Sequence, residues 1–467
     1  MQATQVTKQS FLDKTFKLKE NKTNIRTEVL AGTTTFMTMA YILVVNSNIL
    51  ADAGMDKGAA FTATAIGAFI GSCIMGILAN YPVALAPGMG LNAFFAYTVV
   101  LSMGYSWQFA LCAVFIEGII FILMSVTNVR EKILDCIPNV LKDSITAGIG
   151  LFIAFVGLAN CGLVTNGATI LQLGNLQDPL VLLTIFGLIA ISILLAKNVK
   201  GAFLIGMLIV SAVGMAIGLV EVPNAVVSSV PSMKPVFLQA LSIPFNQIFS
   251  FDMFMVVLTF LFMDLFTTVG CLVGVASKGN MLDEDGKLPR VKQALLSDSI
   301  ATTVGALLGT STVTSYVESA AGIGEGGRTG LTAITTGFMF LLALFFAPIF
   351  TSIPTQATAP VLILVGVIDV YKRQEYTKLN TEECLKELLK FNGVGPKVGD
   401  CIALFGMQKY DTFPVDVWVK RVMQEFYVEE DLSLPKIRAY AIDKFKELSG
   451  FAQQYLFYYA RELGIGR

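Results

Sequence analysis

The chain has 467 residues, of which 54% are hydrophobic and 14% charged, and its net charge is -1. This composition is too apolar and too poor in charge for a wholly soluble protein, so it predicts a chain that lies mostly in lipid. Roughly the last hundred residues carry nearly half of all Lys, Arg, Asp and Glu, which predicts a second, soluble domain there. Histidine is absent, so acid-base chemistry falls to carboxylates or lysines.

Residues 1–28 are polar and basic and lack the apolar core of a cleaved signal peptide, so we expect a cytoplasmic tail. Apolar segments of membrane-spanning length then recur. Eleven are complete, and a twelfth begins near Ala359 and is cut short. The eleven lie at roughly 29–50, 59–79, 83–101, 108–127, 142–162, 179–196, 201–220, 252–276, 294–310, 312–326 and 328–350.

The basic residues set the expected orientation. With the N-terminus inside the cell, alternate loops are rich in Lys and Arg, and the opposite loops hold only Lys57 and Lys234. Cytoplasmic loops of membrane proteins carry such an excess. The pattern predicts a multi-pass protein of the cytoplasmic membrane, surrounded by lipid, with its N-terminus and its C-terminal domain in the cytoplasm.

Two of the apolar segments are poor continuous helices. Residues 82–92 contain two prolines and two glycines, and residues 309–314 are rich in hydroxyl and β-branched side chains. We expect both to be half extended and half helical, which is tolerated at membrane depth only where protein or a water-filled cavity satisfies the backbone. Broken third and tenth segments favour a transporter with inverted repeats. A channel with re-entrant loops is the alternative.

Two carboxylates lie inside apolar stretches, where an ionised group costs about 3 kcal/mol by insertion scales. They are Asp264 in the eighth segment and Glu318 in the broken tenth. As functional groups they would accept hydrogen bonds from a planar ligand, and one could carry a proton. The alternative is a structural role, with hydroxyls of nearby threonines as partners. Glu117 has equally apolar surroundings, and there the two interpretations are balanced.

Four motifs in this order resemble the guanine/hypoxanthine permease branch of the nucleobase:cation symporters. They are 27–32 (TEVLAG), 86–95 (APGMGLNAFF), Asp264-Leu265-Phe266 with Gly270, and 317–330 (VESAAGIGEGGRTG), and the resemblance covers about residues 15–366. It implies an all-α polytopic transporter with inverted seven-span repeats that carries purine nucleobases with a proton. It also implies a substrate site at Asn92, Asp264 and Glu318. No cofactor besides the coupling proton is expected, and a homodimer is compatible with it.

The sequence departs from that family in two ways. Thr267 and Cys271 stand where related permeases usually have Asp and Thr, which leaves the neighbouring substrate contacts open. Spans twelve to fourteen are also missing, so we expect a truncated second repeat that cannot complete alternating access. Which purine is preferred stays open.

From Glu375 onward the pattern is that of soluble amphipathic helices. Their predicted apolar faces are Cys384, Leu385, Leu388 and Leu389, then Val398, Cys401, Ile402 and Phe405, then Val417, Val419, Val422, Met423 and Phe426. A glycine hairpin at Gly393 and Gly395 precedes Pro396, and its backbone N–H groups would suit a DNA phosphate. A plain helix-helix turn is the alternative. Asp416 is expected to cap the following helix, either as its only role or beside a catalytic one.

Hairpin, Lys397 and Asp416 in this order resemble the helix-hairpin-helix DNA glycosylases, and residues 450–457 (GFAQQYLF) are similar to 8-oxoguanine glycosylase/lyases. The resemblance implies that Lys397 is the Schiff-base nucleophile and that Asp416 orients it. It implies that Cys401, Gln453 and Phe457 line the pocket for a base flipped out of damaged DNA. Only the C-terminal part of that family is present, so whether this fragment is an enzyme stays open.

Residues 369–374 (DVYKRQ) separate the two resemblances. They match the translation of a sequencing-adapter transposon end, GAT-GTG-TAT-AAG-AGA-CAG, although a basic flank of a membrane span would look similar. We therefore expect a tail at 1–28, a permease domain at 29–368, an adapter-like junction at 369–374 and a glycosylase fragment at 375–467. The principal function is purine transport. A membrane-tethered repair lyase and a true bifunctional protein are the alternatives.

Overall fold

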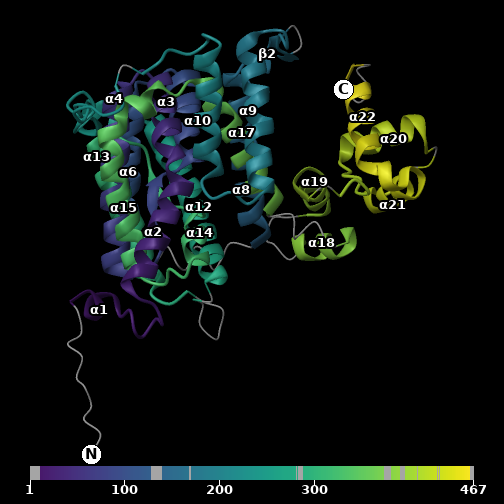
Figure 1. The fold of residues 1–467 in the computed structure, drawn as a ribbon. Coiled ribbons are helices and arrows are strands. Elements are labelled where there is room, and N and C mark those ends of the chain that lie inside the picture. Colours follow the sequence, from purple (N-terminus) through teal and green to yellow (C-terminus); the bar gives the residue numbers. More distant parts are fainter. Residues whose placement is uncertain are drawn as a thin grey trace, which may run out of the picture. The chain divides into compact units, whose positions relative to one another are not determined.

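The computed structural model describes residues 11–127, 139–167, 170–223, 225–279, 281, 288–372, 380–389, 395–407, 409–428, 430 and 432–462. The chain forms two compact units. The large unit holds residues 1–136 and 149–367, and the small unit holds 137–148 and 368–467 (Figure 1). Helices α8 and α17 each contribute to both units.

The prediction of a mostly helical chain is confirmed. The α-helices of the large unit, including the two that it shares, are α1 (Phe11–Phe16), α2 (Ile25–Met39), α3 (Tyr41–Asp52), α4 (Lys57–Ile74), α5 (Met89–Ala93), α6 (Trp107–Val126), α8 (Asn139–Asn160), α9 (Pro179–Ala196), α10 (Ala202–Ala216), α11 (Phe245–Ile248), α12 (Phe251–Lys278), α13 (Val291–Leu308), α14 (Ser319–Gly324), α15 (Gly330–Ala343), α16 (Ala347–Ser352) and α17 (Thr355–Lys372). Short 3-10 or π segments are η1 (Met75–Ala79), η2 (Phe94–Ser102), η3 (Gln239–Leu241) and η4 (Leu344–Phe346).

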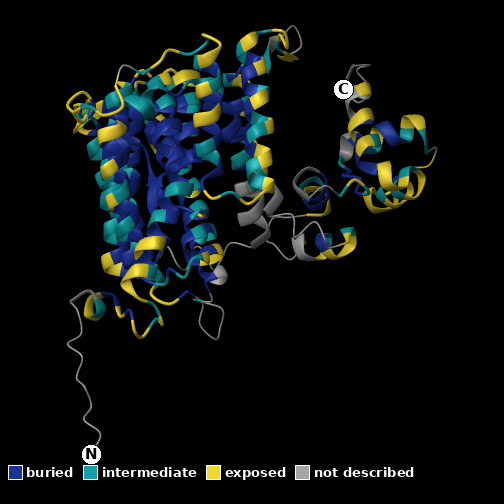
Figure 2. Cartoon of the chain, viewed as in Figure 1, coloured by how far each residue is buried: buried dark blue, intermediate teal, exposed yellow. Residues whose placement is uncertain are grey.

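The large unit is built to lie in a membrane. Among the described residues, six helices are long and apolar enough to cross it: Ile25–Asp52, Lys57–Ala79, Trp107–Val126, Pro179–Ala196, Phe251–Ala276 and Gly330–Ser352. Four shorter apolar helices coincide with further predicted segments: Met89–Ser102, Gly148–Asn160, Ala202–Ala216 and Thr355–Ile368. The large apolar side chains of Leu123 and Ile189 are 62% and 56% exposed, as expected for residues that meet lipid. Figure 2 shows buried residues gathered inside the large unit and exposed residues along its outer helices.

Helix α13 lies at the predicted ninth segment and is the most polar of the long helices. It packs on α6 and α4, and it buries Ser297, Asp298, Ser299 and Thr302. A helix enclosed by other helices need not be apolar all round, because protein groups rather than lipid meet its polar side chains.

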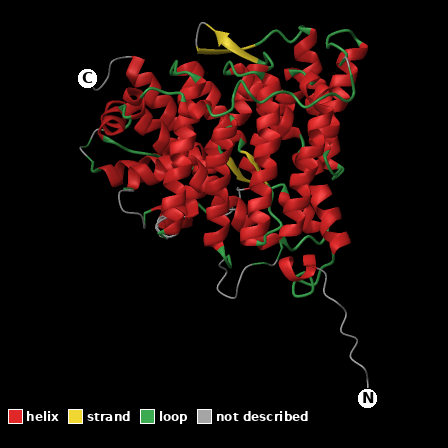
Figure 3. Ribbon diagram, turned by 90° about the vertical axis from the view of Figure 1, so that its left-hand side faces the viewer, coloured by secondary structure: helices red, strands yellow, loops and turns green. Residues whose placement is uncertain are grey.

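Both broken segments contain a short extended stretch, as the sequence predicts, and the two stretches pair with each other. β1 (Leu85–Pro87) pairs antiparallel with β4 (Val313–Ser315), and both are buried. Figure 3 shows short strands surrounded by helices. Gly309 ends α13 with φ +95, a conformation that favours glycine, and this turns the chain into β4. A second pair, β2 (Val164–Gly167) with β3 (Ile170–Leu173), lies in the loop after α8.

The small unit continues from the end of α17 with α18 (Thr381–Leu388), α19 (Pro396–Met407), α20 (Val417–Phe426), α21 (Leu434–Phe445), a 3-10 turn η6 (Lys446–Leu448) and α22 (Ser449–Glu462). Its core includes Phe413, Val419, Met423 and Ile437. Pro396 starts α19, as predicted.

Three apolar positions of the predicted helix faces are exposed instead of buried. Leu389 is 45%, Val398 42% and Phe426 42% exposed, so the periodicity was wrong for them. All three lie in or next to short helices, where one register error moves a residue to the other face. The predicted junction 369–374 covers the end of α17, and its last two residues are outside the described range.

Candidate functional site

The pairing of β1 with β4 is the centre of the candidate site. Backbone hydrogen bonds extend the pairing at both ends, from the Gly88 N–H to the Thr312 carbonyl at 2.9 Å and from the Tyr316 N–H to the Ala84 carbonyl at 3.1 Å. A Cβ on Gly88 would lie 2.7 Å from Cγ2 of Thr314, so the close approach of the strands requires glycine there. The strands thus satisfy each other's backbone away from water.

Residues 311–318, which include β4, contact polar side chains from several other elements. The Ser311 hydroxyl donates to Oδ1 of Asn92 on α5, and the Thr312 hydroxyl donates to Oε2 of Glu117 on α6 at 3.0 Å. The Tyr316 hydroxyl donates to the Pro87 carbonyl at 2.5 Å. One short segment therefore links α5, α6 and β1.

Asp264, on α12, is fully buried and lies one turn before Thr268. Oγ1 of Thr268 is 3.1 Å from Oδ1 of Asp264, 2.7 Å from Oγ1 of Thr314 and 3.0 Å from Oδ2 of Asp298 on α13. Of the threonines considered as structural partners of Asp264, Thr268 makes this contact, whereas Thr267 donates to the Met263 carbonyl.

Glu318 lies directly before α14 and is half-buried. Its Oε1 accepts a hydrogen bond from the hydroxyl of Tyr41 at 2.7 Å, and Tyr41 is 1% exposed at the start of α3. This hydrogen bond helps to fix the orientation of the carboxylate.

Asn92 is buried, and only one of the two polar atoms of its amide has a hydrogen-bond partner among the described residues. Oδ1 accepts from Ser311, while Nδ2 has no hydrogen-bond partner among the residues that the structure describes. A buried amide N–H without an acceptor costs about 1–3 kcal/mol, so such a group requires an explanation. Asn92, Asp264 and Glu318 all connect to the 311–318 segment, Asn92 through Ser311, Asp264 through Thr268 and Thr314, and Glu318 as its last residue.

Lys397 and Asp416, from α19 and the start of α20, meet in the small unit. Nζ of Lys397 is 3.2 Å from Oδ2 of Asp416, with the side chains 49% and 32% exposed. The other oxygen, Oδ1, accepts from the Val419 N–H at 2.8 Å, so the predicted N-cap is confirmed. Capping and contact with Lys397 therefore do not compete, because each uses its own oxygen.

The remaining predicted residues of the small unit are spread over α19 and α22. Cys401 lies one turn after Lys397, and burial raises the pKa of its thiol while the charge of Lys397 partly offsets this, so the thiol is neutral at physiological pH. Gln453 is 6% exposed in α22, and its amide oxygen accepts from Gln454. The space around Gly395 is open, whereas Gly393 and the side chain of Phe457 lie outside the described residues.

Residues 26–373 match the xanthine/uracil permease family, described as a permease family. The chain belongs to this permease family. A guanine/hypoxanthine permease of Bacillus subtilis (strain 168) is 50% identical over 365 residues, covering 76% of this chain and 82% of the relative. An adenine permease of Escherichia coli (strain K12) is 44% identical over 366 residues, covering 78% of this chain and 81% of the relative.

A solved membrane transporter shares the fold of the permease-family part of the chain. The transmembrane domain of the cyanobacterial bicarbonate transporter BicA gives a TM-score of 0.57 at 16% identity, covering 74% of this chain and 89% of that domain, so the two share a fold. An 8-oxoguanine glycosylase/lyase of Clostridium acetobutylicum bound to DNA is 52% identical where it matches, covering 23% of this chain and 40% of that one, with a TM-score of 0.19.

Sequence reasoning missed two side chains of the permease site. Asp298 is fully buried and reaches Thr268, but its neighbours Ser297 and Ser299 make the segment look like an ordinary polar helix. Tyr41 precedes Glu318 by 277 residues, and nothing local connects them. An acidic residue inside a predicted span was the signal for Asp298, since the same signal found Asp264 and Glu318.

Proposed function

We propose that this permease carries purine nucleobases across the cytoplasmic membrane, with a proton as the coupling ion. Relatives named for guanine, hypoxanthine and adenine support the substrate class. Asn92, Asp264 and Glu318 form the proposed binding site. No other cofactor is proposed.

The observation that carries this proposal is the unused N–H of Asn92. A purine edge presents both N–H donors and bare nitrogen or carbonyl acceptors. An amide can donate to one of those acceptors, while Asp264 and Glu318 accept from the N–H groups. A buried orphan donor, linked through residues 311–318 to two carboxylates, thus suits a flat, polar heterocycle better than an apolar solute or a simple ion.

The arrangement in the membrane is part of the proposal. We take α1 and the small unit to lie on the cytoplasmic side, because the basic loops favour that side. We take the two broken segments to be equivalent parts of two inverted repeats, since β1 leads into α5 as β4 leads towards α14.

Equilibrium binding to the purified 467-residue chain tests the proposal, because the expected truncation of the second repeat affects alternating access and leaves Asn92, Asp264 and Glu318 in place. Labelled guanine, hypoxanthine or adenine should bind, and replacing Asn92→Ala should raise Kd by about tenfold to a hundredfold through the loss of one buried hydrogen bond. Ser242→Ala, at an exposed hydroxyl that bonds only within its own turn, is the control. If none of the three bases binds, the substrate assignment is wrong.

The small unit supports a second candidate function, DNA lyase activity on a damaged base. The favouring observation is the 3.2 Å contact of Lys397 with Asp416. It places a carboxylate beside the amine that would form a Schiff base. We expect borohydride to trap the chain on 8-oxoguanine duplex DNA, with trapping lost in Lys397→Gln. Lys386→Gln, on exposed α18, is the matched control. Undiminished trapping by Lys397→Gln would remove Lys397 from the chemistry.

We also propose that residues 369–374 join two unrelated genes. The adapter-like string coincides with the change from apolar to charged sequence. Amplification of genomic DNA across codons 360–380 decides the matter, because a continuous product that encodes this junction would refute the proposal.

A further inference from the structure

The hydroxyl of Thr268 has more polar neighbours than its single proton can serve. Its Oγ1 lies within 3.1 Å of oxygens from Asp264, Asp298 and Thr314. A threonine hydroxyl donates one hydrogen bond and accepts two. If Thr268 donates to one carboxylate and accepts from Thr314, the third contact is a hydrogen bond only when the second carboxyl brings its own proton.

Burial also favours a single proton on the two carboxyls. Asp264 and Asp298 are both 0% exposed, and both face the same hydroxyl from neighbouring helices. Two carboxylates that share a buried site do not both ionise readily, because each charge disfavours the other and burial disfavours both. One protonated and one ionised carboxyl satisfies both constraints.

We propose that Asp264 and Asp298 hold one proton between them through the hydroxyl of Thr268, and that this is the proton carried with the substrate. The inference rests on the proposed function for its second part only. It assigns Asp298 as a further functional residue and Thr268 as the residue whose hydroxyl passes the proton between the two carboxyls.

The proton transfer from Asp264 to Asp298 keeps the number of protons in the cluster constant. When a substrate N–H approaches Asp264, that carboxyl must be an acceptor. Its O–H bond breaks as the proton passes to Oγ1 of Thr268, and the former Thr268 proton forms the new O–H bond on Asp298. Ser315 donates to the second oxygen of Asp298 at 3.5 Å, a weak contact.

The other titratable groups around this cluster have separate partners. Glu117 on α6 accepts from Thr312, and Glu318 accepts from Tyr41. Tyr316 donates to the Pro87 carbonyl. The basic residues at the start of α13 point elsewhere, since Lys292 donates to the Val126 carbonyl and Arg290 lies over the ring of Tyr81.

Infrared spectroscopy of the purified full chain tests the shared proton without any substrate. The C=O stretch of a buried protonated carboxyl should be present in the unaltered chain and should be lost in both Asp264→Asn and Asp298→Asn. Thr268→Val keeps both carboxyls, so the band should persist but shift, because the bridging hydroxyl is gone. Glu221→Gln, at an exposed loop carboxylate, should change nothing. A band that survives Asp298→Asn at full strength, or that does not move in Thr268→Val, overturns the inference.

Transport separates this inference from the proposed function. Because Asp298→Asn is permanently neutral, it should still exchange labelled for unlabelled base while losing accumulation driven by an imposed proton gradient. Retained accumulation overturns the coupling role of Asp298. If the unaltered chain binds no purine while the infrared result holds, the proposed substrate fails and the shared proton stands.

Discussion

Replacing Asp264→Asn or Glu318→Gln is expected to abolish measurable purine binding. Each change keeps the shape of the side chain but turns an acceptor into a donor that faces the N–H groups of the base. The loss of a charge-assisted hydrogen bond and the burial of an unmatched N–H together cost about 3–5 kcal/mol, or about two to four orders of magnitude in Kd. Equilibrium binding of labelled base to the purified chain measures this effect.

A graded variant distinguishes loss of binding from loss of folding. Tyr41→Phe removes only the hydroxyl that donates to Glu318, so it should weaken purine binding severalfold, by about 1 kcal/mol. Glu221→Gln, at the exposed loop, should leave binding unchanged. Binding at full affinity by Asp264→Asn or Glu318→Gln would exclude that carboxylate from the substrate site.

The sequence predicts those parts of this site whose residues are unusual for a membrane-spanning helix. Prolines and glycines within an apolar run indicated the extended segment at β1, and hydroxyl residues indicated β4. Asp264 and Glu318 stood out because acids are costly in apolar spans. Each of these signals is readable within one short window of the chain.

What the sequence does not show is which segments meet. Thr268 joins Asp264 to Asp298 across 30 residues only because α12 and α13 both pack around β4, and no local pattern specifies that packing. The same limit explains Tyr41, whose partner lies in another half of the domain. Side chains whose role depends on tertiary contact therefore remain hidden until the helices are placed.

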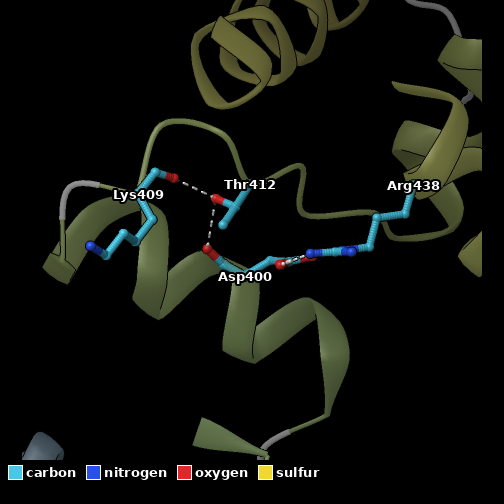
Figure 4. Close-up of polar contacts among 4 residues, drawn as sticks. All are labelled: Asp400, Lys409, Thr412 and Arg438. Carbon is cyan, nitrogen blue, oxygen red and sulfur yellow. Dashed lines mark hydrogen bonds and ion pairs between the residues drawn. The ribbon is translucent and has the colours of Figure 1, made fainter. Parts of the chain in front are cut away.

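The small unit shows the same division. Asp416 was predictable as an N-cap from the residues that follow it, and the structure confirms that cap. The ion pair of Asp400 with Arg438 was not predicted, because Arg438 lies in an amphipathic helix and looks like an ordinary surface residue. Figure 4 shows this pair beside Thr412, whose hydroxyl donates to the backbone carbonyl of Lys409 at 2.8 Å and lies 3.5 Å from that of Asp400.

Arg438→Met is expected to destabilise the small unit more than any change at its surface. Nε and Nη2 of Arg438 lie 2.5 Å and 2.7 Å from the two carboxylate oxygens of Asp400, which joins α21 to α19. Asp400 is 1% exposed on its side chain, whereas Arg438 is 30% exposed. Removing the arginine leaves the buried carboxylate of Asp400 without a counter-charge and should cost about 3–5 kcal/mol of unfolding free energy.

The unequal burial of the two partners makes the prediction specific. Asp400→Asn leaves an arginine that still reaches water, so it should cost about 1–2 kcal/mol, the loss of charge-assisted bonds alone. The double variant with Asp400→Asn and Arg438→Met should recover part of the larger loss, because no unpaired buried charge remains. Equal costs for the two single variants would contradict this account.

Tryptophan fluorescence can follow the unfolding of the small unit within the full chain. The sequence has two tryptophans, Trp107 in α6 and Trp418 in α20, so a Trp107→Phe background leaves one reporter in the small unit. The hydrogen bonds to Asp400 raise the pKa of Arg438 above its ordinary value. A raised pKa means that this contribution is complete below the unfolded value and is lost only as pH rises through the folded one. Arg438 therefore stays charged between about pH 6 and pH 9, and the destabilisation by Arg438→Met, measured by urea unfolding, should be constant over this range. A steady decline of that destabilisation as pH rises across this range would show that the arginine does not act as a fixed charge.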